Sequence, residues 1–416
     1  MEEQGSIVKL KLIIKNNLSR FGESQRDMYH FLQVIGQAFL EEGYILTKYS
    51  HEAMGHQIAD IIILQSFLRK HSFDGRRPCI VLNPNRSANR ELASEVKASF
   101  FDIVHSNYVD FCFCNLPILP NCVLDLSADI HQFQKGPYQL YPALDSYDFS
   151  GDLFDLRSNA EYSSSLRKFS NYLSMNEIEQ GKYVCVHIRS SGFSSEIGQK
   201  EAYRLRNTPV SFLYPLADFL HDNKIKVVRI GGSHMPPFSH PNVIDQALNN
   251  IKFPYLDLLL CKFSLFNLLD NSGASFLSVL SRPQTFLYNL APPMMLGWAP
   301  RDISIHQNLI WKDSRESLTY DEIFMQNGPA IDCSALSWDK IGVSSLISSS
   351  FEILELGILA LELSLFPSKY EPLCHHALNK RLLSCIPATA FNYGVRASCP
   401  PSFLKRKELR FLKSRR

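Results

Sequence analysis

The apolar positions of this chain predict a first series of short strands and amphipathic helices. Apolar runs of strand length alternate with segments in which apolar residues recur at helical spacing. The expected strands are Tyr44–Tyr49, Pro78–Leu82, Phe111–Cys114 and Val123–Leu126, and the expected helices are 55–69 and 89–100. Such alternation is typical of a parallel sheet whose strands are connected by helices.

A second series of the same kind follows a stretch without periodicity. Between Ser127 and Asp155 the periodicity fades, and Gly, Pro, Tyr and Asp become frequent. The expected strands are then Lys182–Arg189, Lys226–Ile230, Phe263–Leu269 and Gln284–Tyr288, and the expected helices are Ser163–Leu173, Ser211–Asn223, Leu256–Cys261 and one that opens at Asn271. We therefore expect an α/β protein with two doubly wound, Rossmann-like domains, residues 1–150 and 151–345.

Residues 346–416 are expected to form a helical extension. Ser349 and Glu352 have the spacing of a capping box at the start of the apolar segment Ile353–Phe366. That segment is short and contains two glutamates, which favours a buried helix over a membrane span. The final run, Lys405–Arg416, is basic with interspersed apolar residues. It has two interpretations, a peripheral contact with an anionic membrane surface or a frayed, solvated tail.

Composition places the chain among globular proteins. Its 416 residues are 45% hydrophobic and 20% charged, which is enough to bury large cores. The net charge of +2 gives no argument for nucleic acid as a partner. The start, Met1–Gly5, has no basic region followed by an apolar one, so we predict no signal peptide and a cytoplasmic location, peripheral at the inner face of the membrane if the basic tail binds there.

The cysteines give little evidence for a metal or cofactor. The ten cysteines are scattered and include no CxxC pair, and the spacing of Cys112 and Cys114 or of Cys374 and His375 is a weak signal. Buried, reduced thiols are the favoured interpretation. No DxD-type pair stands at a strand end, and neither a GxGxxG fingerprint nor a Walker motif is present. We expect no metal, no cofactor, and neither a dinucleotide dehydrogenase nor a P-loop NTPase.

The strongest chemical signal is the end of the strand Lys182–Arg189. His187 and Arg189 are two residues apart, so they share one side of the strand. The carboxyl ends of strands are where open α/β sheets bind ligands. The arginine fork matches phosphate oxygens, which makes Arg189 a candidate for a phosphate or pyrophosphate site. An ordinary strand end with a solvated arginine is the alternative.

Two more loops of the second domain should meet at the same edge. One contains Gly231 and Gly232, and the other contains Ser272, Gly273 and Ser275. Glycines allow close approach of backbone N–H groups, and a small polar turn that opens a helix favours anions. Tight turns and a helix N-cap are the alternatives for each loop alone. Together with Arg189 the loops predict a cradle for the diphosphate of a nucleotide sugar.

The first domain offers one candidate of its own. His56 follows a predicted strand and opens a helix, so it is a candidate base or hydrogen-bond donor that faces the same ligand. Asp60, four residues on, is positioned to orient it. A surface or capping histidine is the alternative. Asp257 and Glu322 are the acidic candidates for a ribose, with a helix start as the alternative for Glu322.

Six motifs, in this order, resemble a bacterial glycosyltransferase family associated with surface-polysaccharide genes. They are Val186-His187-Ile188-Arg189, Ile230-Gly231-Gly232, Asp257–Cys261, Asn271-Ser272-Gly273-Ala274-Ser275, Trp298-Ala299-Pro300 and Leu318–Ile323. The resemblance covers roughly Lys182 to Phe324, and Met54-Gly55-His56 is similar to that family's early glycine–histidine turn. More distantly, the histidine–arginine strand and serine-rich turn resemble O-fucosyltransferase-like enzymes.

The resemblance implies a GT-B architecture, in which two Rossmann-like domains face each other and the second binds the donor. It implies a metal-independent transferase that moves a sugar from a nucleotide diphosphate donor to a glycan, lipid-linked or protein acceptor. The family commonly has an acid after the arginine, and this chain has Ser190 there. Two alternatives therefore stay open, a nucleotide-sugar 2-epimerase on the same fold and a binding or assembly protein without turnover.

Overall fold

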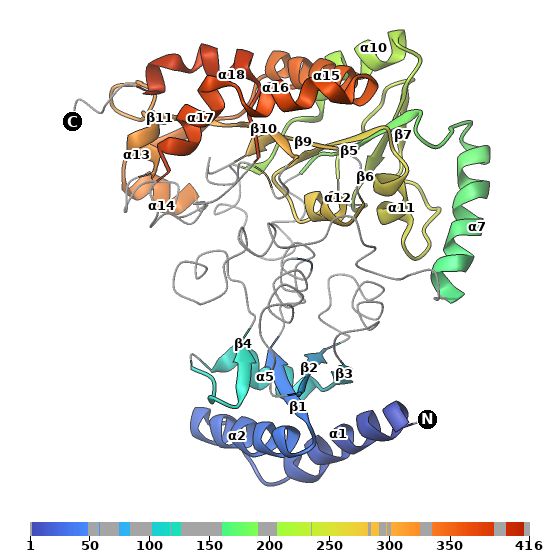
Figure 1. Ribbon diagram of the computed structural model, residues 1–416, viewed down its shortest axis with the longest axis vertical. Coiled ribbons are helices and arrows are strands. Elements are labelled where there is room, and N and C mark those ends of the chain that lie inside the picture. The colour runs from blue at the N-terminus through green and yellow to red at the C-terminus, as the bar shows by residue number, and fades with distance from the viewer. Residues whose placement is uncertain are drawn as a thin grey trace. The chain divides into compact units, whose positions relative to one another are not determined.

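The computed structural model contains two compact units, Met1–Leu156 and Arg157–Arg416 (Figure 1). The second unit includes residues 346–416, the predicted helical extension. The structure describes residues 2–48, 58, 75–83, 102–116, 118–125, 160–189, 206–233, 235–281, 284–290, 297, 301–324, 335–386 and 397–411. Each unit contains a parallel sheet with helices, which confirms the α/β class.

The first unit is built on a four-stranded parallel sheet with the order β3-β2-β1-β4. The strands are β1 (Tyr44–Lys48), β2 (Arg77–Leu82), β3 (Asp102–His105) and β4 (Val123–Asp125), and the helices are α1 (Glu2–Leu18), α2 (Gln25–Glu41) and α5 (Asn107–Asn115). Helix α2 begins where the side chain of Ser24 accepts the backbone N–H of Asp27. Its apolar stripe, which includes Phe31, Ile35 and Phe39, is buried in one core with residues of the sheet.

The predicted strand Phe111–Cys114 is wrong, because this segment lies in helix α5. The side chain of Ser106 caps the helix by accepting the N–H of Val109 at 3.3 Å. Val109, Cys112 and Phe113 are buried at helical spacing, whereas Cys114 is exposed. The two cysteines therefore do not share a side. The strand of this region is β3, which the sequence pattern did not indicate.

The second unit is built on a six-stranded parallel sheet with the order β10-β9-β8-β5-β6-β7. Its strands are β5 (Tyr183–His187), β6 (Lys226–Ile230), β7 (Val243–Asp245), β8 (Phe266–Asp270), β9 (Thr285–Leu290) and β10 (Ile303–His306). From β5 the chain adds β6 and β7 on one side, and β8 then returns to the other side of β5. The strand order thus reverses between β5 and β8, which is a topological switch point.

Helices cover both faces of this sheet (Figure 1). Those of the second unit are α7 (Ala160–Met175), α10 (Tyr214–Asp222), α11 (Leu256–Lys262), α12 (Ser275–Ser281), α13 (Tyr320–Phe324), α14 (Ala335–Lys340), α15 (Ser350–Leu365), α16 (Tyr370–Cys374), α17 (Ala377–Ser384) and α18 (Pro401–Arg406). Short 3₁₀ turns are η3 (Val210–Leu213), η5 (Pro367–Lys369) and η6 (Glu408–Phe411), and β11 (Asn308–Trp311) pairs antiparallel with β12 (Val343–Leu346). Helices α10 and α15 lie on one face, and α11 and α12 lie on the other.

Helix α15 is the apolar helix expected at the start of the extension. Ser349 and Glu352 form the complete capping box, which confirms that prediction. At Gly357 an added methyl group would overlap Cδ1 of Leu216, so the glycine permits the close packing of α15 on helix α10. Among the described residues, no helix is long and apolar enough to cross a membrane.

The basic C-terminal run is packed into the second unit as far as Phe411. Phe411 is buried, and Arg410 is 3% exposed and donates a 2.8 Å hydrogen bond to Asn308. Lys407 forms a 3.1 Å ion pair with the capping residue Glu352. The described part of this run is therefore not a frayed tail, and residues 412–416 lie outside the described residues.

Candidate functional site

Three chemically distinctive loops leave neighbouring strands at one edge of the six-stranded sheet. Strand β5 lies between β6 and β8, and His187 is in register with Ile230 on one side and Leu269 on the other. Gly231 and Asp270 therefore follow at the same level as the end of β5. This meeting of the loops at the switch point was expected from the sequence, because each loop follows a parallel strand.

Asp270 is the centre of this cluster. Its side chain is completely buried, and Oδ1 lies 2.8 Å from Nδ1 of His187. The other oxygen, Oδ2, accepts the backbone N–H of Arg189. An ionised carboxylate only accepts hydrogen bonds, so the proton of the His187–Asp270 contact lies on Nδ1 and Nε2 is the nitrogen left for a ligand. Asp270 was not singled out from the sequence.

Hydrogen bonds fix His187 from two further directions. The hydroxyl of Tyr288 donates to the His187 carbonyl at 2.7 Å, and Ser272 Oγ lies 3.1 Å from Nδ1. Burial, and secondarily the charge of Asp270, raises the pKa of Tyr288, so this hydroxyl keeps its proton. Strands β5, β8 and β9 thus hold the histidine in one orientation.

Arg189 is buried rather than solvated. It is 6% exposed, and its carbonyl accepts the N–H of Thr208 at 3.2 Å. The hydroxyl of Thr208 in turn accepts a 2.9 Å hydrogen bond from Asn289 at the end of β9. The alternative of a solvated arginine at the strand end is therefore wrong, because this side chain is buried. A buried cation needs compensation from nearby groups.

The loop after β6 is held by a buried ion pair. Arg229 is fully buried and donates two 2.8 Å hydrogen bonds to the carboxylate of Asp245 on β7. Its remaining Nη1 donates to the carbonyl of Pro236 at 2.6 Å, and Asp245 also accepts the N–H of Phe238 at 2.9 Å. Removing either partner of such a pair costs about 3–5 kcal/mol, so Arg229 has a structural role that the sequence did not reveal.

Gly231 and Gly232 begin that loop, and both are partly exposed. Gly231 has a φ of 140°, and a methyl group there would overlap Sδ of Met235 and lie 2.5 Å from its Cε. The same position is 3.6 Å from Cδ2 of His187. The φ value, which L-residues rarely adopt, explains this glycine and supports the tight-turn interpretation, because the flexible end of the Met235 side chain could move. The turn brings its backbone close to the edge of the His187 ring.

In the loop after β8, the serines and Gly273 differ in what they offer a ligand. The Ser275 side chain is fully buried, and its hydroxyl donates to the Ser272 carbonyl at 2.6 Å. Ser272 is 6% exposed and contacts His187. Gly273 and Ala274 are partly exposed, and their N–H groups have no acceptor within the described part of the chain. The backbone of this turn, more than the Ser275 hydroxyl, is available to a ligand.

Asp257 is a second carboxylate near His187. It lies in helix α11, in the first turn. Burial raises the pKa of Asp257, while the positive charges of Lys252 and His187 oppose that increase. A carboxyl with a raised pKa near a ligand-type histidine is a common feature of functional sites.

Glu322, the other acidic candidate, accepts hydrogen bonds from Thr319 at 2.8 and 2.9 Å. These bonds are those of a capping box, so the interpretation as a helix start holds for Glu322.

The sheet of the first unit has a switch point of its own, between β1 and β4. Lys48 ends β1 and Asp125 ends β4, and their side chains form a 3.5 Å ion pair. His56 and Asp60, the candidates predicted in this unit, lie outside the described residues, as does Ser190 in the second unit. No group of three His, Cys, Asp or Glu side chains that could hold a metal occurs in the part of the chain that the structure describes.

No family model and no curated protein matches this chain. Among solved structures, the glycosyl transferase family 9 protein of Veillonella parvula is 14% identical, with a TM-score of 0.43 over 77% of this chain and 97% of that one. The ADP-heptose heptosyltransferase II of E. coli is 10% identical, with a TM-score of 0.43 over 78% and 99%. An iron-containing dodecameric glycosyltransferase of enterotoxigenic E. coli is 11% identical, with a TM-score of 0.37 over 62% and 61%. At these scores the similarity does not assign a function.

Proposed function

We propose that this chain is a glycosyltransferase that transfers a sugar from a nucleotide diphosphate donor to a glycan, lipid-linked or protein acceptor in surface-polysaccharide biosynthesis. One observation carries the proposal: His187 ends strand β5 at the switch point of the six-stranded sheet, Arg189 follows two residues later, and the buried Asp270 contacts the His187 ring and the Arg189 backbone. Switch points are where open α/β sheets bind nucleotides. The motif resemblance of this same region supports the assignment.

The chemistry follows from the charge that develops when the glycosidic bond breaks. The leaving nucleoside diphosphate gains negative charge, and a fixed arginine stabilises this charge more in the transition state than in the ground state. Arg189 has this role, together with the N–H groups of Gly273 and Ala274, which donate to no acceptor in the described part of the chain. His187 presents Nε2 to the donor, because Asp270 occupies the other ring nitrogen. No metal is required in this scheme, since Arg189 supplies the positive charge.

The acceptor site belongs to the first unit in this proposal. A GT-B enzyme uses two Rossmann-like domains, and the first unit has the same kind of parallel sheet and switch point as the second. Lys48 and Asp125 lie at that switch point. His56, in the segment that follows β1, is the proposed base for the acceptor hydroxyl. We further propose that the enzyme acts in the cytoplasm.

The experiment is to incubate the purified full chain with a panel of ADP-, GDP- and UDP-sugars and analyse nucleotide and sugar separately. A transferase should release free nucleoside diphosphate slowly by donor hydrolysis and faster with its acceptor. Conversion to an isomerised nucleotide sugar would assign the 2-epimerase alternative. Saturable binding with no turnover would assign the binding-protein alternative. The Asp270→Asn variant is the control, since nucleotide release that stays at the unaltered rate in this variant comes from a contaminant.

A further inference from the structure

The outward face of helix α1 is mixed apolar and basic. Val8 and Leu12 are 64% and 52% exposed, and Leu18 is 36% exposed. With Lys11 and Lys15 they follow the spacing i, i+3, i+4, i+7, i+10, so the five side chains fall within an arc of about 120°. Leu10 and Ile14 of the same helix are buried in the core of the first unit. We call the five exposed residues the α1 face.

The two lysines of the α1 face have no acidic partner among the described residues. Neither Lys11 nor Lys15 forms an ion pair with another described residue, whereas their neighbour Lys9 pairs with Glu42 at 2.6 Å. The sequence from Ser6 to Arg20 contains no acidic residue. Exposed aliphatic side chains beside lysines that have no ion pair with a described residue offer both apolar contact and positive charge to an anionic lipid surface.

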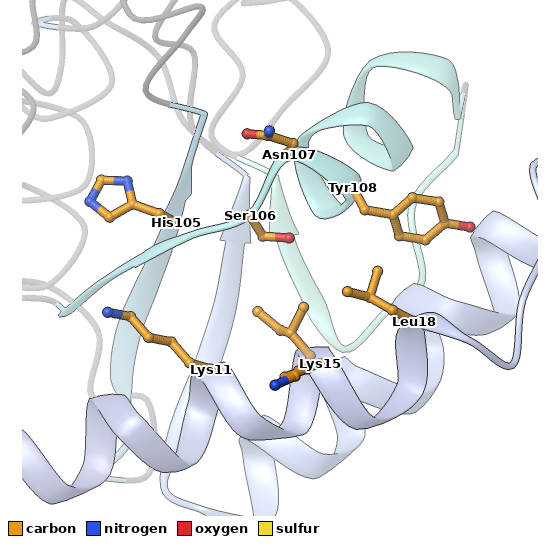
Figure 2. A pocket seen from close by; sticks show the side chains of 8 residues that line it. Lys11, Lys15, Leu18, His105, Ser106, Asn107 and Tyr108 are labelled. Carbon is orange, nitrogen blue, oxygen red and sulfur yellow. The ribbon is translucent and has the colours of Figure 1, made fainter.

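A pocket of about 430 Å³ opens beside this face. Figure 2 shows it between helix α1, which carries Lys11, Lys15 and Leu18, and the turn from His105 to Tyr108 that links β3 to helix α5. Its lining includes the basic side chains of Lys11, Lys15 and His105 and the apolar side chains of Ile14 and Leu18. Ser106, Asn107 and Tyr108 add a hydroxyl, an amide and a phenol. Such a lining matches a phosphate attached to an apolar body.

We propose that the α1 face binds an anionic lipid bilayer, with a lipid headgroup phosphate in the adjoining pocket. The charge of the face selects this occupant over a neutral surface, and its aliphatic side chains enter the acyl boundary. The basic C-terminal run differs in both respects, since its apolar residue Phe411 is buried and Lys407 is ion-paired. This inference extends beyond the proposed function, and its test uses no nucleotide.

The test is flotation of the full chain with phosphatidylcholine vesicles and with vesicles that also contain phosphatidylglycerol. The unaltered chain should bind only the second kind, less at high salt. Each basic residue near the headgroups contributes roughly a fivefold factor, so the double variant Lys11→Gln/Lys15→Gln should bind roughly thirtyfold more weakly. The matched control is Arg167→Gln/Lys168→Gln, which removes the same charge from an exposed part of helix α7. It should bind like the unaltered chain.

A second variant locates the face directly and does not depend on the folding of the double variant. Leu12→Trp should show tryptophan emission at shorter wavelength when phosphatidylglycerol vesicles are added, after subtraction of the unaltered chain with its three tryptophans. Three results would each overturn the proposal. They are an equal loss of vesicle binding in the two double variants, full vesicle binding by Lys11→Gln/Lys15→Gln, and unchanged emission of the tryptophan at position 12. A dimer that Leu12→Ser dissociates, without vesicle binding, would assign the face to a second copy of the chain instead.

Discussion

Replacing Asp270 with asparagine removes the carboxylate that organises the candidate site and changes almost nothing else in shape. The carboxylate accepts from His187 at 2.8 Å and from the backbone of Arg189. Asparagine keeps one acceptor, and its amide group is a donor that would face one of these two donors. The loss of one hydrogen bond to a charged, fully buried group corresponds to about 1.5–3 kcal/mol. We expect the melting temperature to fall by roughly 3–6 °C, at about 2 °C per kcal/mol for a unit of this size.

The assay is a thermal melt of Asp270→Asn together with calorimetric titration of ADP, GDP and UDP. The nucleoside diphosphate that binds the unaltered chain should bind about tenfold or more weakly, because Asp270 positions both His187 and Arg189. The control is Asp218→Asn, which breaks a 3.0 Å contact with His240 in which the Asp218 side chain is 72% exposed. That change should have an effect near zero. If the two variants behave alike in both measurements, Asp270 does not organise a binding site.

Three more substitutions test other parts of the account. Arg189→Ala should lower the rate of sugar transfer about a hundredfold, which corresponds to a loss of about 3 kcal/mol of transition-state stabilisation, and Arg189→Lys should restore only part of it. A lower melting temperature with unchanged nucleotide affinity would make Arg189 purely structural. Gly231→Ala should lower the free energy of unfolding by roughly 1–3 kcal/mol, because the φ of this residue is 140°. Adding Met235→Ala should remove the overlap with the new methyl group but leave the backbone strain, so full recovery of stability in the double variant would refute the strain. Burial lowers the pKa of His306 from 6.5 to about 3, so the neutral side chain stabilises the fold at neutral pH. As the pH falls from 7 to 5, melting curves should show a loss of about 2 kcal/mol in the free energy of unfolding. His306→Asn should reduce this pH dependence, and an unchanged dependence of stability on pH would contradict the prediction.

Much of the second unit could be predicted from sequence because its strands are buried on both faces. Strand β6 occupies the predicted residues, and β5 and helix α11 deviate by three residues or fewer at any end. Parallel strand ends gather at one edge, so the three loops of the site could be placed together without any distance information. The predicted strand at Phe263–Leu269 began three residues early, because Phe263 still donates to Leu259 as the end of α11.

The remaining features depend on contacts that no local pattern encodes. The segment around Cys112 is short and apolar, so its period is ambiguous, and the cap at Ser106 decides for helix. Asp270 contacts His187 across 83 positions of sequence, and Arg229 finds Asp245 only because β6 and β7 are neighbours. The aspartate at the end of an apolar strand was visible in the sequence, but its partner was not.

The most direct test of the central claim is hydrogen–deuterium exchange of the full chain with and without a saturating nucleoside diphosphate. The account predicts slower exchange in peptides that contain the end of β5, from His187 to Arg189, and the turn from Asn271 to Ser275, because the diphosphate occupies the switch point between β5 and β8. Peptides from β10 and from helix α2 should be unaffected. Protection confined to the first unit, or ligand binding that leaves both of these second-unit segments unchanged, would contradict the claim.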